Sequence, residues 1–454
     1  MIVPVMEMAR TRMTASDPRR ASLLGRAREA SATGETAGYI AEKPKTLPIF
    51  KHYQPAAGDP DWQRLLAEAE EIVAEARPML ERPRRGLAEL GRRTAAYRQA
   101  LGNFRKNRSL ARQGREDLRP LYFIWTLLRN CNFGCEYCDD HQGRRYPELP
   151  KQGTLDTEQG RKLLEIMRTG TCSVYFAGGE PTMRKDLPEL TRAARDLGYF
   201  PIVINTNGSL FHKVLRRESW RTFLADIDIV VVSLDALRPA RLNELWVTER
   251  SQDVLRNLLV LWLLSAEMRF KLMVNTVILP GAAGDARAVL DFANDMGIWF
   301  CPVPVNQGPT VAAELAGDRE YDELVAAILD RKRAGYRVTG SLRMNERLLR
   351  SAPLHCRNTL KPHIDHDGRL VWPCKATVNV KPRYVDVLRF SSVDSLYEYA
   401  SAEIDPTGFH GPGADQCGAN CNWAQNYTTD AYAHGLTHPR ALVAEVVSFL
   451  GRGR

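Results

Sequence analysis

The chain has 454 residues, 44% of them hydrophobic and 26% charged, which allows a large catalytic domain with smaller units and is typical of a globular protein. Nine cysteines without a signal-peptide pattern argue against a secreted disulfide scaffold and for a reducing, cytoplasmic compartment. No apolar run reaches the roughly 18 residues that cross a bilayer, so we expect no transmembrane segment.

The net charge of +9 is concentrated near the N-terminus, because residues 1–120 hold 23 Lys and Arg against 15 Asp and Glu. Residues 1–45 have no sustained hydrophobic period and are predicted to form a mobile or loosely docked leader. An Asp-Pro-Asp entry followed by apolar residues at helical spacing predicts a helix from Asp61 to about Leu80.

A second, strongly basic helix is predicted between residues 87 and 115. The segment from Arg92 to Arg115 has eight basic residues and no acidic one, and apolar residues recur at helical spacing. Three interpretations are open: a solvated cationic face on a helix packed against the protein, contact with anionic lipid headgroups, or, least favoured, contact with nucleic acid. The apolar positions are Leu87, Leu90, Tyr97, Leu101 and Phe104.

From Pro120 short apolar runs alternate with helical segments, which predicts strand-helix units and a parallel sheet. Six such strands predict an α/β fold, a partial (β/α)6 TIM-like barrel that is open at one side. Reactive groups in parallel barrels lie at the C-terminal ends of the strands, so the site is expected there. The predicted strands are residues 122–128, 173–177, 201–205, 227–233, 271–278 and 298–303.

Three cysteines, Cys131, Cys135 and Cys138, follow the first predicted strand. A 4Fe-4S cubane normally takes four thiolates, so a loop that supplies three leaves one iron open. Zinc sites and thioredoxin-type pairs use spaced pairs of ligands instead. With Tyr137 before the third cysteine, this spacing resembles the motif of the radical S-adenosylmethionine (radical SAM) enzymes.

That resemblance implies a mechanism and a set of cofactors. The ammonium and carboxylate of S-adenosylmethionine (SAM) would chelate the open iron, and one electron from a donor such as flavodoxin or ferredoxin would pass through the cluster. The resulting 5'-deoxyadenosyl radical would take a hydrogen atom from the substrate. Tyr137 is expected among the residues that contact the cofactor.

The ends of the next strands carry further motifs that resemble those of this family. Gly178, Gly179, Glu180 and Pro181 match its Gly-Gly-Glu-Pro motif, which implies that the backbone and Glu180 receive the methionyl ammonium group. Glycine lets a backbone come close to a ligand, and a carboxylate suits a cation. The other expected cofactor contacts are Asn207 in a Thr-Asn-Gly segment that is otherwise a polar turn, Ser233 and Asp235 in Ser-Leu-Asp, and Asn275 and Val277 on the fifth strand.

Four more cysteines, Cys356, Cys374, Cys417 and Cys421, have 17, 42 and 3 residues between them. With a reverse-turn glycine between the first two, they resemble the auxiliary-cluster domain known as twitch, a shortened relative of the SPASM domain. Four thiolates would close a second 4Fe-4S cluster, although four cysteines also satisfy tetrahedral zinc. The last spacing is one residue longer than usual and further SPASM cysteines are absent, so one auxiliary cluster is expected.

We expect no chemistry from the two remaining cysteines or from the histidines of the C-terminal third. Cys172 and Cys301 are expected to be buried thiols, and histidines 363, 366, 434 and 438 to be surface or loop residues, because none pairs with a second ligand at metal spacing. A last amphipathic helix is predicted over 439–450. The predicted domains are a leader with a basic helical extension (1–116), the radical SAM partial barrel (117–312) and the auxiliary-cluster domain with the last helix (313–454).

The sequence therefore predicts a radical SAM enzyme with one auxiliary 4Fe-4S cluster that abstracts hydrogen from an unactivated carbon. Peptide, lipid tail and small metabolite stay open as substrates, and peripheral contact with an anionic membrane is compatible with the basic helix. The alternative is a non-enzymatic iron-sulfur electron carrier or a zinc-stapled nucleic-acid-binding protein, but neither explains Gly178–Pro181 after the second strand.

Overall fold

The computed structural model describes residues 46–84, 86–115, 117–138, 153–307, 310–354, 357–372, 383–404, 421–438, 440–441 and 445. From Leu47 onward the chain forms one compact unit. Several predictions lie outside the described residues: the leader before residue 46, the cysteines Cys356, Cys374 and Cys417, and most of the helix predicted over 439–450.

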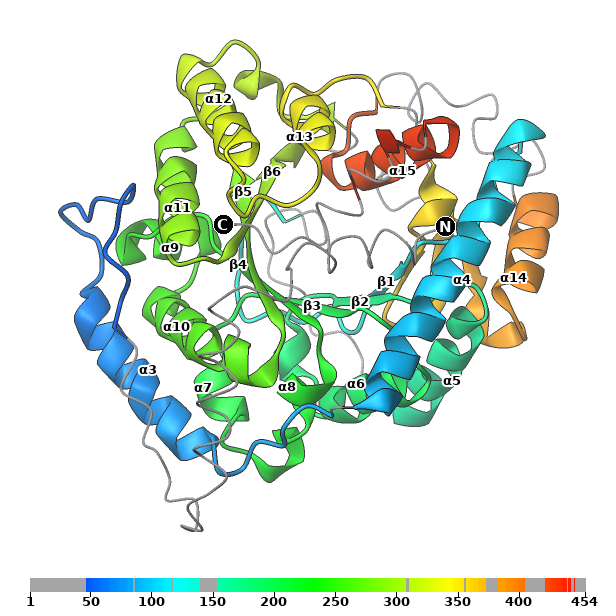
Figure 1. The fold of residues 1–454 in the computed structure, drawn as a ribbon, viewed down its shortest axis with the longest axis horizontal. Coiled ribbons are helices and arrows are strands. Elements are labelled where there is room, and N and C mark those ends of the chain that lie inside the picture. Colours follow the sequence, from blue (N-terminus) through cyan, green and yellow to red (C-terminus); the bar gives the residue numbers. More distant parts are fainter. Residues whose placement is uncertain are drawn as a thin grey trace, which may run out of the picture. The chain divides into compact units, whose positions relative to one another are not determined.

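All six predicted strands are confirmed in their predicted order. Each is parallel to the next, and the connecting helices cover the outer side of the curved sheet (Figure 1). Their near-continuous apolar runs are typical of parallel strands that are covered on both faces. The strands are β1 (Phe123–Thr126), β2 (Val174–Ala177), β3 (Ile202–Thr206), β4 (Ile229–Ser233), β5 (Lys271–Ile278) and β6 (Trp299–Pro304).

Three of the helices between these strands start where the sequence supplies a cap or a proline. Helix α5 begins with a capping box, in which Asp156 accepts a hydrogen bond from the Gln159 amide and Gln159 accepts one from the Asp156 amide. The connecting helices are α5 (Thr157–Arg168), α6 (Leu187–Asp196), α7 (Phe211–Val214), α8 (Phe223–Asp226), α9 (Pro239–Trp246), α10 (Ser251–Met268) and α11 (Ala283–Asp295).

The sheet continues beyond β1 into the C-terminal region, which the sequence did not predict. Strand β9 (His363–Ile364) pairs in parallel with β1, β10 (Arg369–Trp372) returns antiparallel to β9, and β11 (Arg383–Asp386) follows. Gly368 in the turn between β9 and β10 has φ +80°, as expected of a reverse-turn glycine. The nine-stranded sheet runs from β11 to β6 without closing, so the predicted partial barrel is confirmed.

Residues on the two faces of the sheet alternate along each strand. Phe123 and Trp125 of β1 lie in the large core between the sheet and the outer helices, so Ile124 between them faces the barrel interior. Strand register places Tyr175 of β2 and Val203 of β3 beside Ile124 on this inner face. A second apolar cluster fills part of the interior and consists of Val203, Ile229, Val231, Met273 and Trp299, with Tyr175 packed against it.

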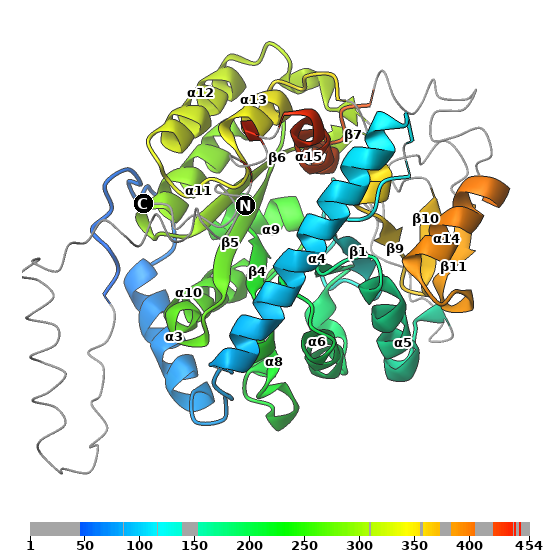
Figure 2. The same ribbon diagram turned by 45° about the vertical axis from the view of Figure 1, so that its right-hand side comes forward.

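Helices of the C-terminal half lie on the open side of the barrel. Helix α13 (Leu342–Leu349) packs against β6 and against α15 (Tyr427–Thr437), and α15 also packs against α4 (Leu87–Arg112). Figures 1 and 2 show α15 between α13 and α4, on the side where β6 and the β9–β11 extension do not join. The other elements here are α12 (Arg319–Arg333), α14 (Val393–Tyr399) and the short pair β7 (Asn306–Gln307) and β8 (Thr310–Val311).

The two predicted N-terminal helices are confirmed. Helix α3 (Trp62–Ala76) is capped by Asp61 and packs its apolar stripe on α10. Helix α4 departs from the expected amphipathic pattern in its first half, where Leu87, Leu90 and Tyr97 are 86%, 61% and 45% exposed, whereas Leu101 and Phe104 are half-buried. The face toward the barrel instead carries polar residues such as Asn107, which is fully buried.

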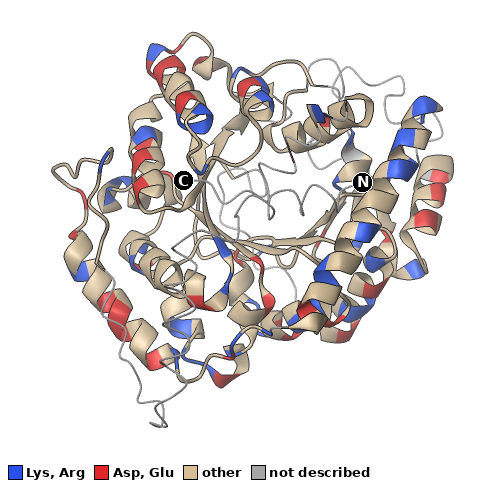
Figure 3. Cartoon of the chain, in the orientation of Figure 1, with Lys and Arg blue, Asp and Glu red and all other residues tan. Residues whose placement is uncertain are grey.

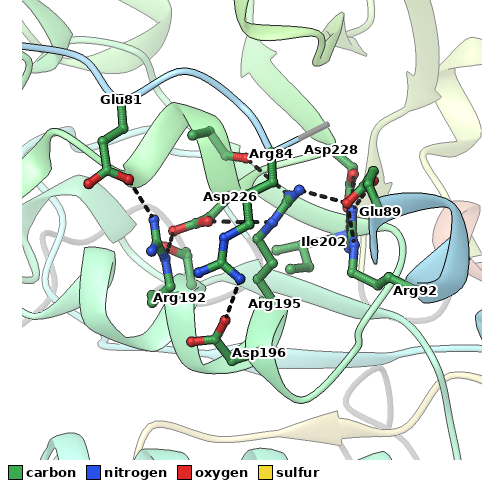
Figure 4. A network of polar contacts seen from close by, with 12 residues as sticks. Glu81, Arg84, Glu89, Arg92, Arg192, Arg195, Asp196, Ile202, Asp226 and Asp228 are labelled. Atoms are coloured by element: carbon green, nitrogen blue, oxygen red, sulfur yellow. Dashed lines mark hydrogen bonds and ion pairs between the residues drawn. The ribbon is translucent and has the colours of Figure 1, made fainter. Parts of the chain in front are cut away.

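An ion network holds the first half of α4 on the barrel (Figure 4). The side chain of Arg92 is 8% exposed and lies 2.9 Å from both the Glu89 and the Asp228 carboxylates. Arg195 of α6 binds Glu89 at 2.7 Å, and Asp228 also accepts a hydrogen bond from the Ile202 amide. Glu89, Arg92 and the buried Asn107 share one face of the helix, about a third of a turn from Leu87, Leu90 and Tyr97. This polar stripe faces the barrel, so these three apolar residues remain exposed.

Within the described residues, every helix is too short or too polar to span a bilayer.

Candidate active site

The cysteine loop begins where β1 ends, so the three thiols lie at the C-terminal edge of the sheet. Main-chain hydrogen bonds fix this loop from two sides: Gly179 donates to the Leu128 carbonyl at 2.8 Å and Glu180 to the Asn130 carbonyl at 2.9 Å, while Gly134 donates to the carbonyl of Trp246 at 2.9 Å. The loop is therefore positioned by the ends of β2 and α9 as well as by its own strand.

Gly178 and Gly179 are needed for contact between these two loops. Gly178 has φ +141°, and a Cβ there would lie 2.5 Å from the Leu128 carbonyl oxygen. A Cβ on Gly179 would lie 2.0 Å from the carbonyl oxygen of Asn130. Both glycines were expected to allow close approach of a ligand. In the structure they lie close to the backbone of the cysteine loop.

Glu180 is fully buried beside this contact. Its carboxylate accepts hydrogen bonds from the Thr182 amide at 2.9 Å, the Thr206 hydroxyl at 2.6 Å and the Asn207 amide at 2.7 Å, and from the Thr182 hydroxyl. Burial raises the pKa of Glu180, and the threonine hydrogen bonds offset part of this rise. The carboxylate thus joins the ends of β2 and β3, and Pro181 starts a short 3-10 turn after it.

Asn207 connects β3 to the first cysteine. Its Nδ2 donates to Asn132 Oδ1 at 2.8 Å and lies 3.8 Å from Cys131 Sγ, while its Oδ1 accepts from the amide and hydroxyl of Ser209. A hydrogen bond to a cysteine sulfur stabilises the thiolate form, which is the form that binds iron.

Tyr137 and Asp235 form a buried pair below the loop. The Tyr137 hydroxyl donates to Asp235 Oδ2, Trp246 Nε1 donates to the same oxygen at 2.7 Å, and the Val277 amide donates to Asp235 Oδ1 at 2.7 Å. Phe133 stacks on Trp246 with 5.4 Å between ring centroids. Asp235 was expected to contact the cofactor, but its two oxygens are engaged by the chain itself and hold the residue between Cys135 and Cys138.

Ser233 and Asn275 differ from this set. Ser233 ends β4 and Asn275 lies beside it within β5; the two are paired in register and are half-buried. Among the described residues neither side chain has a hydrogen-bond partner, so both are available to a ligand above the strand ends. Val277 lies two residues further along the same strand, and its amide is used by Asp235.

The electrostatic setting of the thiols fits metal binding. Burial raises the pKa of Cys131 to about 12, and the nearby Glu180 carboxylate and Cys138 add to the rise. Burial also raises the pKa of Cys135, with contributions from Asp235 and from both neighbouring cysteines. The three sulfurs are thus close enough to influence one another, and an iron cluster would displace their protons and neutralise their charge.

Some residues that build the site were not anticipated from the sequence. Arg129, two residues before Cys131, forms an ion pair with Asp365 in the β9–β10 turn and so ties the C-terminal hairpin to the cysteine loop. Thr182, Thr206 and Trp246 position Glu180 and Asp235. The threonines follow recognisable motifs, but Arg129 and Asp365 are 236 residues apart and leave no local signal.

Of the four downstream cysteines, the structure describes only Cys421, which is 7% exposed and packs with Trp423. Cys172 is buried as predicted, and Cys301 is half-buried. The histidine prediction is wrong for His363, which is buried in strand β9, whereas His366 is buried but lies in the β9–β10 turn.

Comparison with known proteins identifies the domain. Residues 125–293 match the model of the Radical SAM superfamily. The Fe-coproporphyrin III synthase of Methanosarcina barkeri is 36% identical over 124 residues, which are 27% of this chain and 29% of that protein. A probable GTP 3',8-cyclase of Metallosphaera sedula is 26% identical over 306 residues, 65% of this chain and 90% of that protein.

Among solved structures, Streptococcus suis SuiB bound to precursor peptide SuiA is 15% identical, with a TM-score of 0.49, and the match covers 90% of this chain and 82% of that one. The chain also spans less than a third of the Methanosarcina barkeri relative.

The parallel sheet and the thiol loop at its C-terminal edge define an α/β domain of a class that holds a 4Fe-4S cluster and SAM. Residues 125–293, from β1 into α11, are a radical SAM domain, the catalytic domain of a superfamily of enzymes.

Proposed function

We propose that the protein is a radical SAM enzyme that abstracts a hydrogen atom from an unactivated carbon of its substrate. The observation that carries this proposal is the placement of Cys131, Cys135 and Cys138 on one loop, held against Gly179 and Glu180 at the ends of parallel strands. A carrier of electrons or a zinc-stapled binding protein would need the thiols but not this second loop.

The residues present fit the two cofactors. Three thiols would hold three irons of one cubane and leave the fourth iron for SAM. Ser233 and Asn275 offer side chains without partners among the described residues, which suits contact with the ribose or carboxylate. Glu180 keeps unused acceptor capacity on Oε2, which accepts one hydrogen bond from the chain.

When bound, the cluster and SAM supply reductive cleavage of SAM to methionine and a 5'-deoxyadenosyl radical. The chain's own part is positional. Asn207 would donate to the sulfur of Cys131, Asp235 fixes Tyr137 between the other two cysteines, and the apolar barrel interior excludes water. The electron would come from a small donor such as flavodoxin or ferredoxin.

We also propose a second 4Fe-4S cluster on Cys356, Cys374, Cys417 and Cys421. The support is the β9–β10 hairpin and its turn glycine between the first two cysteines, and the buried setting of Cys421 beside Trp423. Zinc competes for the same four thiols. The proposed domain boundaries lie at residues 116/117 and 312/313. They separate the N-terminal extension, the barrel and the auxiliary-cluster domain.

Anaerobic purification tests both assignments. The wild type is expected to be brown, to carry about eight irons as two cubanes of four, and to form 5'-deoxyadenosine with a strong reductant. Substitution of Cys131, Cys135 or Cys138 by alanine should leave about four irons and abolish 5'-deoxyadenosine. A colourless zinc protein without SAM cleavage would support the binding-protein alternative, and 5'-deoxyadenosine from the alanine variants would overturn the proposal.

The substrate class stays among peptide, lipid tail and small metabolite. The names of the two relatives refer to different small molecules, Fe-coproporphyrin III and GTP. These names support a small metabolite as the substrate of this protein. Transfer of deuterium from a labelled candidate into 5'-deoxyadenosine would identify the substrate.

We further propose a cytoplasmic enzyme that makes peripheral contact with anionic membrane through the outward face of α4. On this face Leu87, Leu90 and Tyr97 are exposed in the first half of the helix. Arg98, Arg105 and Arg112 are exposed further along, without an ion-pair partner among the described residues. Figure 3 shows Lys and Arg positions, in blue, along the length of α4. Exposed leucines beside arginines are typical of interfacial helices.

Sedimentation with liposomes tests the membrane contact. Binding should need anionic lipid and be reversed by high salt, because exposed charges are screened. Replacing Leu87 and Leu90 by serine should weaken binding. The matched control is Ile49→Ser, which removes an apolar side chain that is 91% exposed but lies off this helix. Equal binding of the α4 variant and the control would contradict the proposal.

A further inference from the structure

His363 lies inside the barrel. Strand β9 pairs His363 with Ile124 of β1 and with Val371 of β10. Its neighbour Ile364, like Leu370 on β10, packs in the outer core, so alternation places His363 on the inner face that Ile124 also lines. Only 6% of the residue is exposed.

The imidazole of His363 has no hydrogen-bond partner on either ring nitrogen within the described part of the chain. Its nearest described ring is Trp423, with 5.6 Å between centroids. A buried polar group without a partner destabilises the fold, so such groups in native proteins call for an explanation. Burial lowers the pKa of His363 to about 3, with a contribution from Lys361, so the ring is neutral and offers one donor and one acceptor.

Other inner-face groups share this property. Asn205 of β3 lies on the same face, in register with Val231 of the inner cluster, and its buried Oδ1 has no partner among the described residues. Nearer the strand ends, Ser233 and Asn275 are also available. The inner wall therefore presents unpaired polar groups from β9 up to the proposed cofactor site.

We propose that His363 binds the substrate, and that its N–H donates a hydrogen bond to a carboxylate of that substrate inside the barrel. An anion is favoured because the Lys361 ammonium lies nearby, with Nζ 5.2 Å from the centre of the Trp423 ring that neighbours His363, and an N–H bond to a charged oxygen is stronger than one to a neutral oxygen. Trp423 supplies an apolar wall beside the same position. The inference rests on the proposed radical SAM function and adds to it the class of substrate.

The test compares reconstituted full-length wild type with His363→Leu and His363→Gln. The probe is a size-fractionated, heat-clarified extract of cells that produce the protein, used as prepared or after methyl esterification of its carboxylates. Three quantities are measured: the urea midpoint, 5'-deoxyadenosine formed without extract, and the increase in 5'-deoxyadenosine that the extract causes.

Wild type is expected to respond to the native extract and not to the esterified one. His363→Leu should keep its urea midpoint or raise it, because it removes an unpaired buried polar group, and should keep basal SAM cleavage. Its response to extract should fall by at least about tenfold, the effect of losing a hydrogen bond to a charged group. His363→Gln retains a donor and should recover part of the response.

Four outcomes would overturn the inference. If the response of His363→Leu to the extract is undiminished, the imidazole nitrogens bind a buried water or no partner at all. A wild-type response that survives esterification excludes the carboxylate, and no response to any fraction contradicts a soluble carboxylate substrate. A lower urea midpoint together with lost basal cleavage assigns His363 a structural role. If wild type itself forms no 5'-deoxyadenosine, the proposed function has failed rather than this inference alone.

Discussion

Replacing Asp235 by asparagine is expected to release the cysteine loop while keeping the fold. Asp235 is 2% exposed, and three donors converge on it: the Tyr137 hydroxyl and Trp246 Nε1 on one oxygen, and the Val277 amide on the other. Asparagine has one acceptor oxygen and one NH2 group. In either orientation of the asparagine side chain, its NH2 group therefore faces at least one buried donor.

The size of the effect follows from this count. A buried donor left without an acceptor costs about 1–3 kcal/mol. If NH2 faces Tyr137 and Trp246, the Tyr137 hydroxyl can still accept from Trp246 Nε1, 2.9 Å away, so about one buried hydrogen bond is lost in either orientation. Removing a buried negative charge offsets part of the cost, because burial raises the pKa of Asp235 above its usual range. We expect a net loss of about 1–3 kcal/mol, concentrated at Tyr137 between two of the three iron ligands.

The assay is iron content and cluster spectrum after anaerobic reconstitution, together with 5'-deoxyadenosine formation. Asp235→Asn should lose most of one cluster, and SAM cleavage should fall at least about tenfold. The matched control is Asp318→Ala, which removes the N-cap of α12 and costs about 1 kcal/mol away from the site. It should retain both clusters and near wild-type cleavage.

Full cluster occupancy and normal SAM cleavage in Asp235→Asn would refute this reasoning. Full occupancy with a raised KM for SAM would instead assign Asp235 a direct contact with the cofactor, as the sequence motif implied.

Three other changes give distinct outcomes. Gly179→Ala should prevent cluster binding, because its Cβ would lie 2.0 Å from the Asn130 carbonyl oxygen; iron content checks this. Burial lowers the pKa of Lys271 to about 8, so the unfolded state binds more protons between pH 8 and 10, and stability should rise over that range by up to about 3 kcal/mol. Urea unfolding at each pH should show this slope in wild type and not in Lys271→Met. Arg92→Leu should increase hydrogen exchange throughout α4, since it leaves Asp228 without an ion-pair partner among the described residues and removes one of the three arginines at Glu89, whereas the exposed Arg98→Leu should not.

The six barrel strands were predictable because strands buried on both faces are continuous apolar runs, and their order follows from strand-helix alternation. Strands β9 to β11 were not. Strand β9 has two residues, and its pairing with β1 joins positions more than 230 residues apart. No local period records such a pairing.

The docking of α4 shows a different limit. Its apolar residues have a helical period, but so do its polar ones, about a third of a turn away. In the first half of the helix the polar stripe is buried, because Asp228 and Arg195 on other elements complement Arg92 and Glu89. Hydrophobic periodicity therefore predicted the helix but not which stripe its first half buries.

At the site, the motifs placed Glu180, Asn207 and Asp235 just after strands, but their contacts depended on register. The resemblance of their motifs assigned the carboxylates of Glu180 and Asp235 to the cofactor. In the fold the same carboxylates accept hydrogen bonds from Thr206 and Trp246, which no spacing rule connects to them. Their proposed role is thereby one of positioning, alongside whatever contact they make with SAM.

These contacts converge on one loop, and this has an energetic consequence. Gly179, Glu180, Asn207 and Asp235 each bind a different part of the segment from Leu128 to Cys138. A cubane requires all three thiols in place together, so the loss of one contact already removes much of what the others provide. Substitutions at these positions should therefore be less than additive in their effect on cluster occupancy, in contrast to independent sites elsewhere in the barrel.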